Sequence, residues 1–229
     1  MRRASGNKDI DALLEGGYET DIISTVYGPA GSGKTLFCLL AAIRCVKEGK
    51  KVVFIDTEGG FSVERLKQLS DDYKDILDNV FFLRPTSFKE QKDAFEKLKG
   101  FVNDKIGLII VDTISMLYRL ELGKTDDVYG VNRELGLQIA YLNEIARKKE
   151  IPIIVTNQVY ADFGKRDGVK LVGGDLLKYG SKCMMELGLS GKNRIVSLKK
   201  HRSIEAGKSF LFNITEKGIE KIERKFIPL

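Results

Sequence analysis

The sequence has few of the residues that build metal centres and disulfide frameworks. Its 229 residues include one histidine and three cysteines, and no two cysteines stand in a C-x-x-C pair. Zinc sites and disulfide frameworks need more ligands or more pairs than this. A single histidine also argues against a His-based metal site and against a Ser/His/Asp triad.

Long apolar runs are missing too. No stretch approaches the roughly 18 uninterrupted apolar residues of a membrane span, and the opening residues lead into a polar segment instead of the apolar part of a signal peptide. We therefore expect a soluble cytoplasmic protein with no membrane partner. With only 4 Pro, 12 Phe and 43% hydrophobic residues, the whole chain should fold around a core. The net charge of +6 permits a nucleic acid partner without establishing one.

Apolar patterns alternate between strand and helix, which predicts an α/β fold with a mostly parallel central sheet. The predicted strands lie at residues 21–27, 51–56, 80–83, 108–112 and 151–156. The predicted helices lie at residues 9–14, 34–47, 63–69, 88–102 and 128–149, with Ser62 and Ser87 as N-caps.

The final third of the chain shows a different pattern. We expect residues 160–172 to be irregular, Gly173-Gly174 to open a short helix, and antiparallel strands to follow at residues 183–189, 194–199, 209–214 and 218–222. No repeat or linker divides the chain, so residues 1–229 should form one domain, with residues 1–20 as a short N-terminal cap segment.

One motif carries a specific chemistry. The segment GPAGSGKT matches G-x-x-x-x-G-K-[ST] and stands between a predicted strand and a predicted helix, as a phosphate-binding loop requires. Its glycines let the backbone N–H groups surround nucleotide phosphates, its lysine would neutralise the β- and γ-phosphates, and its threonine would place a hydroxyl on Mg²⁺. The predicted nucleotide-binding residues are Gly28, Pro29, Ala30, Gly31, Ser32, Gly33, Lys34 and Thr35.

Three further polar residues follow predicted strands, at the sheet edge where α/β proteins bind ligands. Asp112 is placed to hold the water shell of Mg²⁺ as a Walker B aspartate, or else it caps the helix that follows. Glu58 is placed to orient the attacking water, or it is a solvated loop acid. Gln158 could sense the γ-phosphate, and a plain turn residue explains it equally well.

Taken in order, GPAGSGKT, IDTEGGF, LIIVD and TNQV resemble the core of the RecA/RadA recombinase family over nearly the whole chain. The resemblance implies a RecA-like P-loop NTPase core that uses ATP and Mg²⁺. It further implies that Glu58 is the catalytic glutamate, that Lys34 and Gln158 act with it on the γ-phosphate, and that Arg65 stacks on adenine. A solvated helix arginine remains the alternative for Arg65.

The chain also departs from the pattern of this family. Full recombinases have a helical DNA-binding domain before the core and an F-x-x-A hook that links subunits. Here only 27 residues precede the glycine loop, and F-x-x-A occurs nowhere. We therefore expect no separate N-terminal DNA-binding domain. The first DNA-binding loop, at residues 121–129, contains Asp126 and Asp127, which repel a phosphate backbone.

Positive charge gathers in two other segments. The second loop, at residues 160–172, carries Lys165, Arg166 and Lys170, and the segment Lys199-Lys200-His201-Arg202 stands where the family places Asp and Pro that cap a neighbour's ATP. The predicted DNA contacts are Lys165, Arg166, Lys170, Lys200, His201 and Arg202. Alternatives are a solvated basic loop for the first segment, and charge donated to a neighbour's nucleotide or a plain exposed strand end for the second.

These features favour an ATP-binding, weakly hydrolysing, DNA-binding protein of DNA repair and homologous recombination. We expect it to assist a RadA-type recombinase instead of exchanging strands itself. The expected partners are single-stranded or branched DNA, that recombinase and Holliday junction enzymes, with a homodimer left open. Two alternatives stand beside it: a nucleotide-gated binding module without functional hydrolysis, and a KaiC-like signalling ATPase. Paired glutamates are typical of the latter, whereas Gly59-Gly60 follows Glu58 here.

Overall fold

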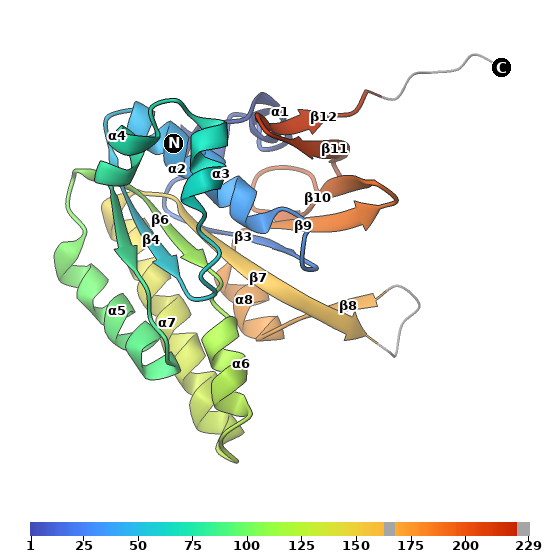
Figure 1. Cartoon of the computed structure of the whole chain (residues 1–229). Helices are drawn as coiled ribbons and strands as arrows, with labels where there is room; N and C mark the ends of the chain where they lie inside the picture. The colour runs from blue at the N-terminus through green and yellow to red at the C-terminus, as the bar shows by residue number, and fades with distance from the viewer. Residues whose placement is uncertain (163–167, 224–229) are drawn as a thin grey trace.

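A mixed β-sheet runs through the computed structural model, which describes residues 1–162 and 168–223 (Figure 1). Within these residues the sheet has ten strands, in the order β12-β11-β10-β9-β3-β7-β6-β4-β5, with β8 paired to β7. The strands are β3 (Ile23–Gly28), β4 (Lys51–Asp56), β5 (Val80–Leu83), β6 (Ile106–Asp112), β7 (Ile153–Asp162), β8 (Gly168–Leu171), β9 (Cys183–Ser190), β10 (Asn193–His201), β11 (Ser209–Thr215) and β12 (Gly218–Lys221).

The parallel part of the sheet brings distant strand ends to one edge. In the pairing of β3 with β7, Gly28 lies opposite Gln158, and in the pairing of β4 with β6, Asp56 lies opposite Asp112. Gly28, Asp56 and Asp112 are the last residues of their strands, and Gln158 lies where the parallel pairing of β7 with β3 ends. The predicted site residues on these strands therefore share one edge of the sheet.

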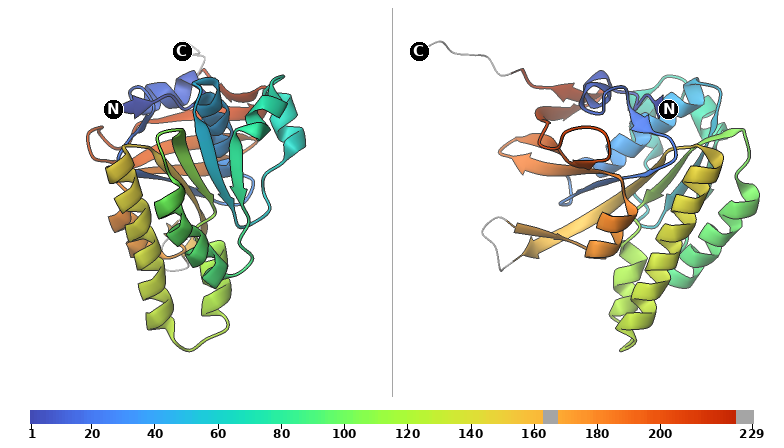
Figure 2. Two further views of the ribbon diagram at one scale, coloured as in Figure 1. Left: turned by 90° about the vertical axis from the view of Figure 1, so that its left-hand side faces the viewer. Right: turned by 180° about the vertical axis from the view of Figure 1, so that it is seen from behind.

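Helices cover both faces of the sheet (Figures 1 and 2). The apolar sides of α1 to α4 join one core cluster, and those of α5 to α8 join another on the opposite face. The strands between them are β-branched and buried on both sides, as in other covered parallel sheets. The helices are α1 (Lys8–Leu13), α2 (Lys34–Lys47), α3 (Val63–Leu69), α4 (Tyr73–Asp78), α5 (Phe88–Phe101), α6 (Met116–Leu122), α7 (Val128–Lys149) and α8 (Gly174–Gly180).

The fold confirms the predicted mixed sheet, with corrections near its end. Residues 160–172 are not simply irregular, because β7 extends to Asp162 and pairs antiparallel with β8. The strand predicted at residues 183–189 is antiparallel to β10 but parallel to β3, so it continues the parallel part of the sheet. Helix α4 was not predicted. Helix α6 was expected only in the alternative in which Asp112 caps a following helix, and its N-cap is Ser115 instead.

The first twenty residues fold back on themselves. A two-stranded sheet of β1 (Arg2–Arg3) and β2 (Tyr18–Glu19) closes the segment around α1, whose N-cap Asn7 accepts hydrogen bonds from the backbone N–H groups of Asp9 and Ile10. Gly17 makes the fold-back possible, since a Cβ there would lie 2.0 Å from the carbonyl oxygen of Arg3. In the part of the chain that the structure describes, no helix is long and apolar enough to cross a membrane.

Candidate nucleotide-binding site

The glycine loop joins β3 to α2 at the carboxyl edge of the sheet. Gly31 and Gly33 take positive φ angles of 73° and 103°, a region that other residues rarely adopt. Gly28 is required by space, because a Cβ would lie 2.3 Å from the carbonyl oxygen of Leu187. The loop therefore turns tightly into the N-terminus of α2, where backbone N–H groups are free to bind an anion.

Lys34 is held against this loop. Its Nζ donates to the carbonyl oxygens of Gly28 at 2.9 Å and Pro29 at 3.0 Å, and the residue is 7% exposed. Burial lowers the pKa of Lys34, and the negative charges of Glu58 and Asp112 oppose this shift. The ammonium group therefore bonds two uncharged carbonyl oxygens, and phosphate oxygens, which carry negative charge, can replace them as its acceptors.

A chain of oxygen atoms links α2, β6 and β7. The Thr35 hydroxyl donates to Asp112 Oδ2 at 2.7 Å, and the Thr156 hydroxyl donates to Asp112 Oδ1. Asp112 is 3% exposed, and burial raises the pKa of its carboxyl group against the effect of these hydroxyls. Burying this charge costs stability, which an ion bound beside it would offset.

These oxygens fit magnesium. Mg²⁺ is bound by one or two protein oxygens together with waters and phosphate oxygens, and no group of three or more His, Cys, Asp or Glu residues that could hold a metal ion occurs within residues 1–162 and 168–223. Gly60 leaves the space beside the pair open. A Cβ at this position would lie 3.6 Å from Thr35 Oγ1 and 3.8 Å from Asp112 Oδ2, in contact with both oxygens.

Glu58 lies on the loop after β4, facing Gln158 in the middle of β7. Its carboxylate accepts a hydrogen bond from the hydroxyl of Thr113 at 3.1 Å and another from Nε2 of Gln158 at 3.3 Å. Two of the three residues predicted to act on the γ-phosphate are therefore in direct contact. A phosphate group that attracts the amide would release the carboxylate from this bond.

Asp56 holds the loop that carries Glu58. Its two carboxylate oxygens accept the backbone N–H groups of Gly60 at 3.0 Å and Phe61 at 3.1 Å, and the residue is 4% exposed. The Phe61 ring packs edge-on against Phe82, with ring centroids 4.5 Å apart. The loop is thus fixed at both ends, by a buried carboxylate and by an aromatic contact.

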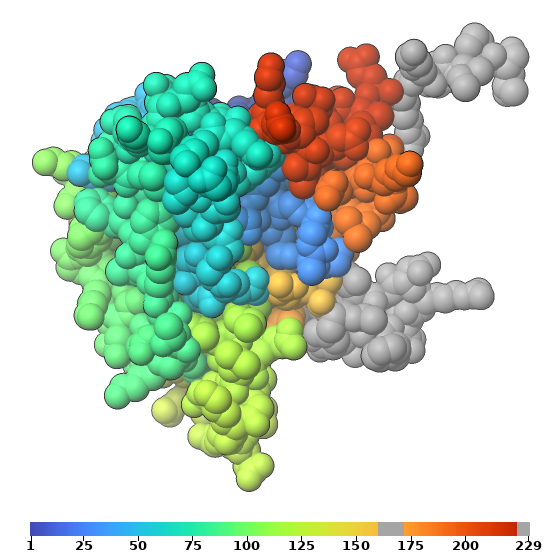
Figure 3. All heavy atoms as spheres, viewed as in Figure 1, coloured from blue at the N-terminus to red at the C-terminus, as the bar shows by residue number. Residues whose placement is uncertain are grey.

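A cavity of about 380 Å³ lies over the glycine loop, lined by Lys34, Thr35, Glu58, Arg65, Asp112 and Gln158 among others. In Figure 3 the loop segment, in blue, reaches the surface between the segment of α3, in cyan to teal, and the C-terminal strands, in orange and red. The Arg65 guanidinium closes the side toward β11, where it donates to the carbonyl oxygens of Thr215 at 2.6 Å and Glu216 at 3.3 Å. All predicted nucleotide residues outside the loop itself therefore meet at one cavity.

The predicted DNA contacts are placed differently. Lys165 and Arg166 lie outside the described residues, and of Lys170 only the backbone, in β8, is described. Lys200, His201 and Arg202 lie at the opposite edge of the sheet from the glycine loop, because His201 pairs with Cys183, which pairs with Ser24 at the start of β3.

Two side chains of this basic segment are already engaged. Arg202 donates to Asp21 at 2.8 and 2.9 Å and to Glu19 at 2.5 Å, and Nζ of Lys200 donates to the carbonyl oxygen of Lys178. Burial lowers the pKa of His201, and its Nδ1 accepts the backbone N–H of Ser203 at 3.1 Å.

Several residues of the site escaped the sequence analysis. Thr156 and Thr113 touch Asp112 and Glu58, and Asp56 anchors the Glu58 loop. Each stands next to or within a motif, at a strand end, which is the signal that could have found it. Arg194 of β10, whose Nε donates to the carbonyl oxygen of Gly31 at 3.0 Å, has no such signal.

A glycine loop between strand and helix, an aspartate at the end of a neighbouring parallel strand and antiparallel strands beyond define a RecA-like P-loop NTPase fold. The chain belongs to the Rad51 family, whose family model matches residues 1–222. The resemblance to the RecA/RadA recombinases is thereby confirmed. Proteins of this family bind nucleotide with Mg²⁺.

Two curated relatives and one solved structure are similar to this chain over nearly its whole length. The DNA repair and recombination protein RadB of Methanobrevibacter smithii is 39% identical over 221 residues, covering 93% of either chain. The protein of the same name from Methanococcus maripaludis is 40% identical over 219 residues, covering 95% of this chain and 99% of that protein. A crystal structure of a RadB recombinase superposes with a TM-score of 0.82 at 37% identity, covering 96% of this chain and 99% of that chain.

Proposed function

We propose that this chain is an ATP-binding, weakly hydrolysing, DNA-binding protein of DNA repair and homologous recombination, accessory to a RadA-type recombinase. The family and the names of its relatives support the process. The observation that carries the nucleotide part is the convergence of Lys34, Thr35, Asp112, Glu58 and Gln158 on one cavity.

In the proposed roles, the glycine loop and Lys34 hold the phosphates, while Thr35 and Asp112 hold Mg²⁺, the latter through water. When bound, Mg²⁺ would neutralise charge on the β- and γ-phosphates. Glu58 would orient the attacking water and Gln158 would respond to the γ-phosphate. Arg65, whose guanidinium is fixed by two carbonyl groups, would present its plane to adenine.

Weak hydrolysis follows from what the site offers. Beside the glycine loop the cationic side chains lining the cavity are Lys34 and Arg65, and proteins of this kind gain much of their rate from further cations supplied by a neighbouring subunit. Without F-x-x-A in these 229 residues, regular stacking of this chain on itself has less support. An accessory role, in a single RecA-like core with residues 1–20 as its cap, fits these features.

A second function is favoured by one contact. Because Gln158 holds Glu58 in the arrangement described here, a nucleotide that recruits the amide would also shift the start of the β7–β8 hairpin. The protein could then act as a nucleotide-gated binding module in which hydrolysis contributes little. Replacing Glu58 with Gln separates the two functions, because it removes the carboxylate that would orient the attacking water.

The accessory role is tested by mixing the purified chain with the host's main recombinase, with and without ATP, followed by pull-down and size-exclusion chromatography. We expect a complex whose amount depends on ATP, and the Lys34→Ala variant should lose that dependence. An accessory role would be contradicted if the added chain changed neither the composition nor the length of the recombinase filaments, with or without ATP.

A further inference from the structure

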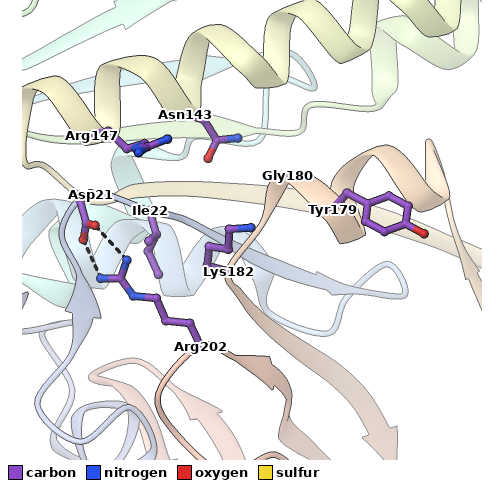
Figure 4. A pocket seen from close by; sticks show the side chains of 8 residues that line it. All are labelled: Asp21, Ile22, Asn143, Arg147, Tyr179, Gly180, Lys182 and Arg202. Carbon is purple, nitrogen blue, oxygen red and sulfur yellow. Dashed lines mark hydrogen bonds and ion pairs between the residues drawn. The ribbon is translucent and has the colours of Figure 1, made fainter.

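A second cavity lies at the opposite edge of the sheet from the nucleotide site. Its volume is about 440 Å³, and its walls come from α7, the end of α8 and the segments before β3, before β9 and after β10. Figure 4 shows Arg147 and Asn143 extending from α7 toward Lys182, with Arg202 and Asp21 facing each other on one side and Tyr179 directed outward on the other. No predicted nucleotide residue lines it.

The charge of this cavity is unbalanced. Its walls carry Arg147, Lys182 and Arg202 against one carboxylate, Asp21, which is already bonded to Arg202. Arg147 and Lys182 are exposed and form no ion pair or side-chain hydrogen bond with any residue that the structure describes. The positive field reaches beyond the cavity. The pKa of Lys200 is lowered mainly by burial and, to a smaller extent, by the positive charge of Lys182. Such a concave positive surface attracts a polyanion.

The backbone holds these cations in place. Gly180 lets α8 approach α7 closely, because a Cβ there would lie 2.4 Å from Cγ2 of Ile139. The backbone N–H of Lys182 then donates to the carbonyl oxygen of Ile23 at 3.1 Å, which fixes the segment to the start of β3. Arg147 and Lys182 are therefore presented from rigid elements on neighbouring walls.

An aromatic ring stands beside the cations. Tyr179 is 78% exposed at the end of α8, although a ring of this size is ordinarily at least half covered in a folded protein. Single-stranded nucleic acids are bound by the same combination, in which cations contact the phosphates and an aromatic ring stacks on a base. The bases of a duplex are already stacked on one another and are not free to stack on the ring.

We propose that this second cavity binds the backbone of single-stranded DNA, with Arg147 and Lys182 on phosphates and Tyr179 on a base. The inference rests on the proposed DNA binding and adds a site separate from the loop at residues 160–172. Since β3 has six residues, the cavity lies about 20 Å from the glycine loop. DNA and ATP can therefore be bound together.

The test is the affinity of a fluorescently labelled oligothymidylate, measured by anisotropy across a salt series. Arg147→Gln with Lys182→Gln should lower affinity about 10-fold or more at ~0.1 M salt, and should reduce the slope of log K against log salt by about 1.4, or 0.7 for each lost phosphate contact. The control is Lys89→Gln with Lys105→Gln, which removes the same charge from two exposed lysines outside the cavity. It should keep at least half of the wild-type affinity.

Tyr179 tests the single-strand part. Tyr179→Ala should lower affinity about 5-fold or more and Tyr179→Phe less than 2-fold, because stacking needs only the ring. Binding of a fluorescent ATP analogue should be unchanged in every variant, which also confirms folding. Equal loss on a duplex of the same length, with no effect of Tyr179→Ala, would replace the proposal by a duplex backbone site.

Two failures remain distinguishable. If the wild-type chain binds no DNA, the proposed DNA-binding function falls together with this site. If the wild-type chain binds DNA and the Arg147/Lys182 variant binds it equally well with the same salt slope, the cavity is not the site, while the proposed function stands.

Discussion

The hydroxyl of Thr35 and the carboxylate of Asp112 are 77 residues apart in the chain and 2.7 Å apart in space. One belongs to the first turn of α2 and the other to the end of β6, so the contact ties the glycine loop to the centre of the sheet. Both oxygens are of the kind that Mg²⁺ binds. The pair therefore gives a direct way to test the proposed metal position.

Thr35→Val should weaken Mg²⁺-dependent ATP binding about 10-fold, whereas Thr35→Ser should stay within about 2-fold of wild type. Valine keeps the shape of threonine and removes the hydroxyl; serine keeps the hydroxyl. Titration calorimetry with and without Mg²⁺ measures both variants. An equal loss for Thr35→Val in the two conditions would place the ion elsewhere.

Asp112 should show opposite effects on stability and on nucleotide binding. Because burial raises the pKa of its carboxyl group, the folded state takes up a proton here more readily than the unfolded state, and the charged form is destabilising. Without Mg²⁺, Asp112→Asn should therefore raise the free energy of unfolding at neutral pH while reducing Mg²⁺-dependent ATP binding.

The pH dependence of that gain has a definite sign. As pH falls through the raised folded-state pKa of Asp112, the wild-type carboxyl group becomes neutral and the advantage of asparagine should disappear. Urea unfolding at several pH values measures this. An advantage that grows toward low pH would contradict the assigned cause.

Glu58→Gln separates hydrolysis from gating. If Glu58 orients the attacking water, turnover should fall about 100-fold or more while ATP affinity changes less than about 2-fold. If the protein acts as a nucleotide-gated module, DNA binding, partner binding and repair in cells should survive this change. Loss of repair together with turnover would instead support an ATPase mechanism.

Asp56→Asn should affect turnover through the position of Glu58. An asparagine has one acceptor oxygen and cannot serve both Gly60 and Phe61, so the loop should shift. We expect kcat to fall about 10-fold to 100-fold with KM for ATP nearly unchanged. Asp71→Asn, at an exposed acid, is the matched control. A change in KM with kcat unchanged would mean that Asp56 acts on binding instead.

Arg202→Gln should destabilise the fold before it affects any ligand. The variant takes from the largely buried carboxylate of Glu19 one of its two charged partners and leaves Arg2 at 3.3 Å, at a cost of about 1 kcal/mol. Lys200→Gln, which loses one bond to a carbonyl oxygen, should cost less than about 0.5 kcal/mol. Thermal unfolding of both variants checks this, and equal stability of the two would contradict a structural role for Arg202.

The sequence predicted the parallel part of the fold well because local and global signals agreed there. Helix α7 follows the predicted boundaries, and the apolar run before Asp112 forms a central strand. The pairing of β9 with β3 could not be predicted, since alternation of side chains does not reveal which strand lies alongside. Short helices such as α4 lack enough periodic positions for a signal.

The candidate site likewise contains residues that the sequence predicted and contacts that it could not predict. Motif spacing located Lys34, Thr35 and Asp112, and the sheet edge located Glu58 and Gln158. The Gln158–Glu58 contact depends on the register of three strands, β4, β6 and β7, and could not be predicted from the sequence. Asp127 was expected only as a charge opposing DNA. It also caps α7 by accepting the backbone N–H of Gly130 at 2.8 Å. Its presence in that loop therefore has a structural explanation apart from any effect on DNA binding.

We propose that this RecA-like core binds and slowly hydrolyses ATP in support of a RadA-type recombinase. The most direct measurement is ATP turnover by the chain alone, with and without single-stranded DNA, beside a strand-exchange assay on the same preparation. We predict slow turnover, stimulation of less than about 3-fold and no exchanged product, because the described residues bring only the cations Lys34 and Arg65 to the cavity and the sequence has no F-x-x-A to stack a second subunit against it. Strong stimulation by DNA together with strand exchange would contradict the account.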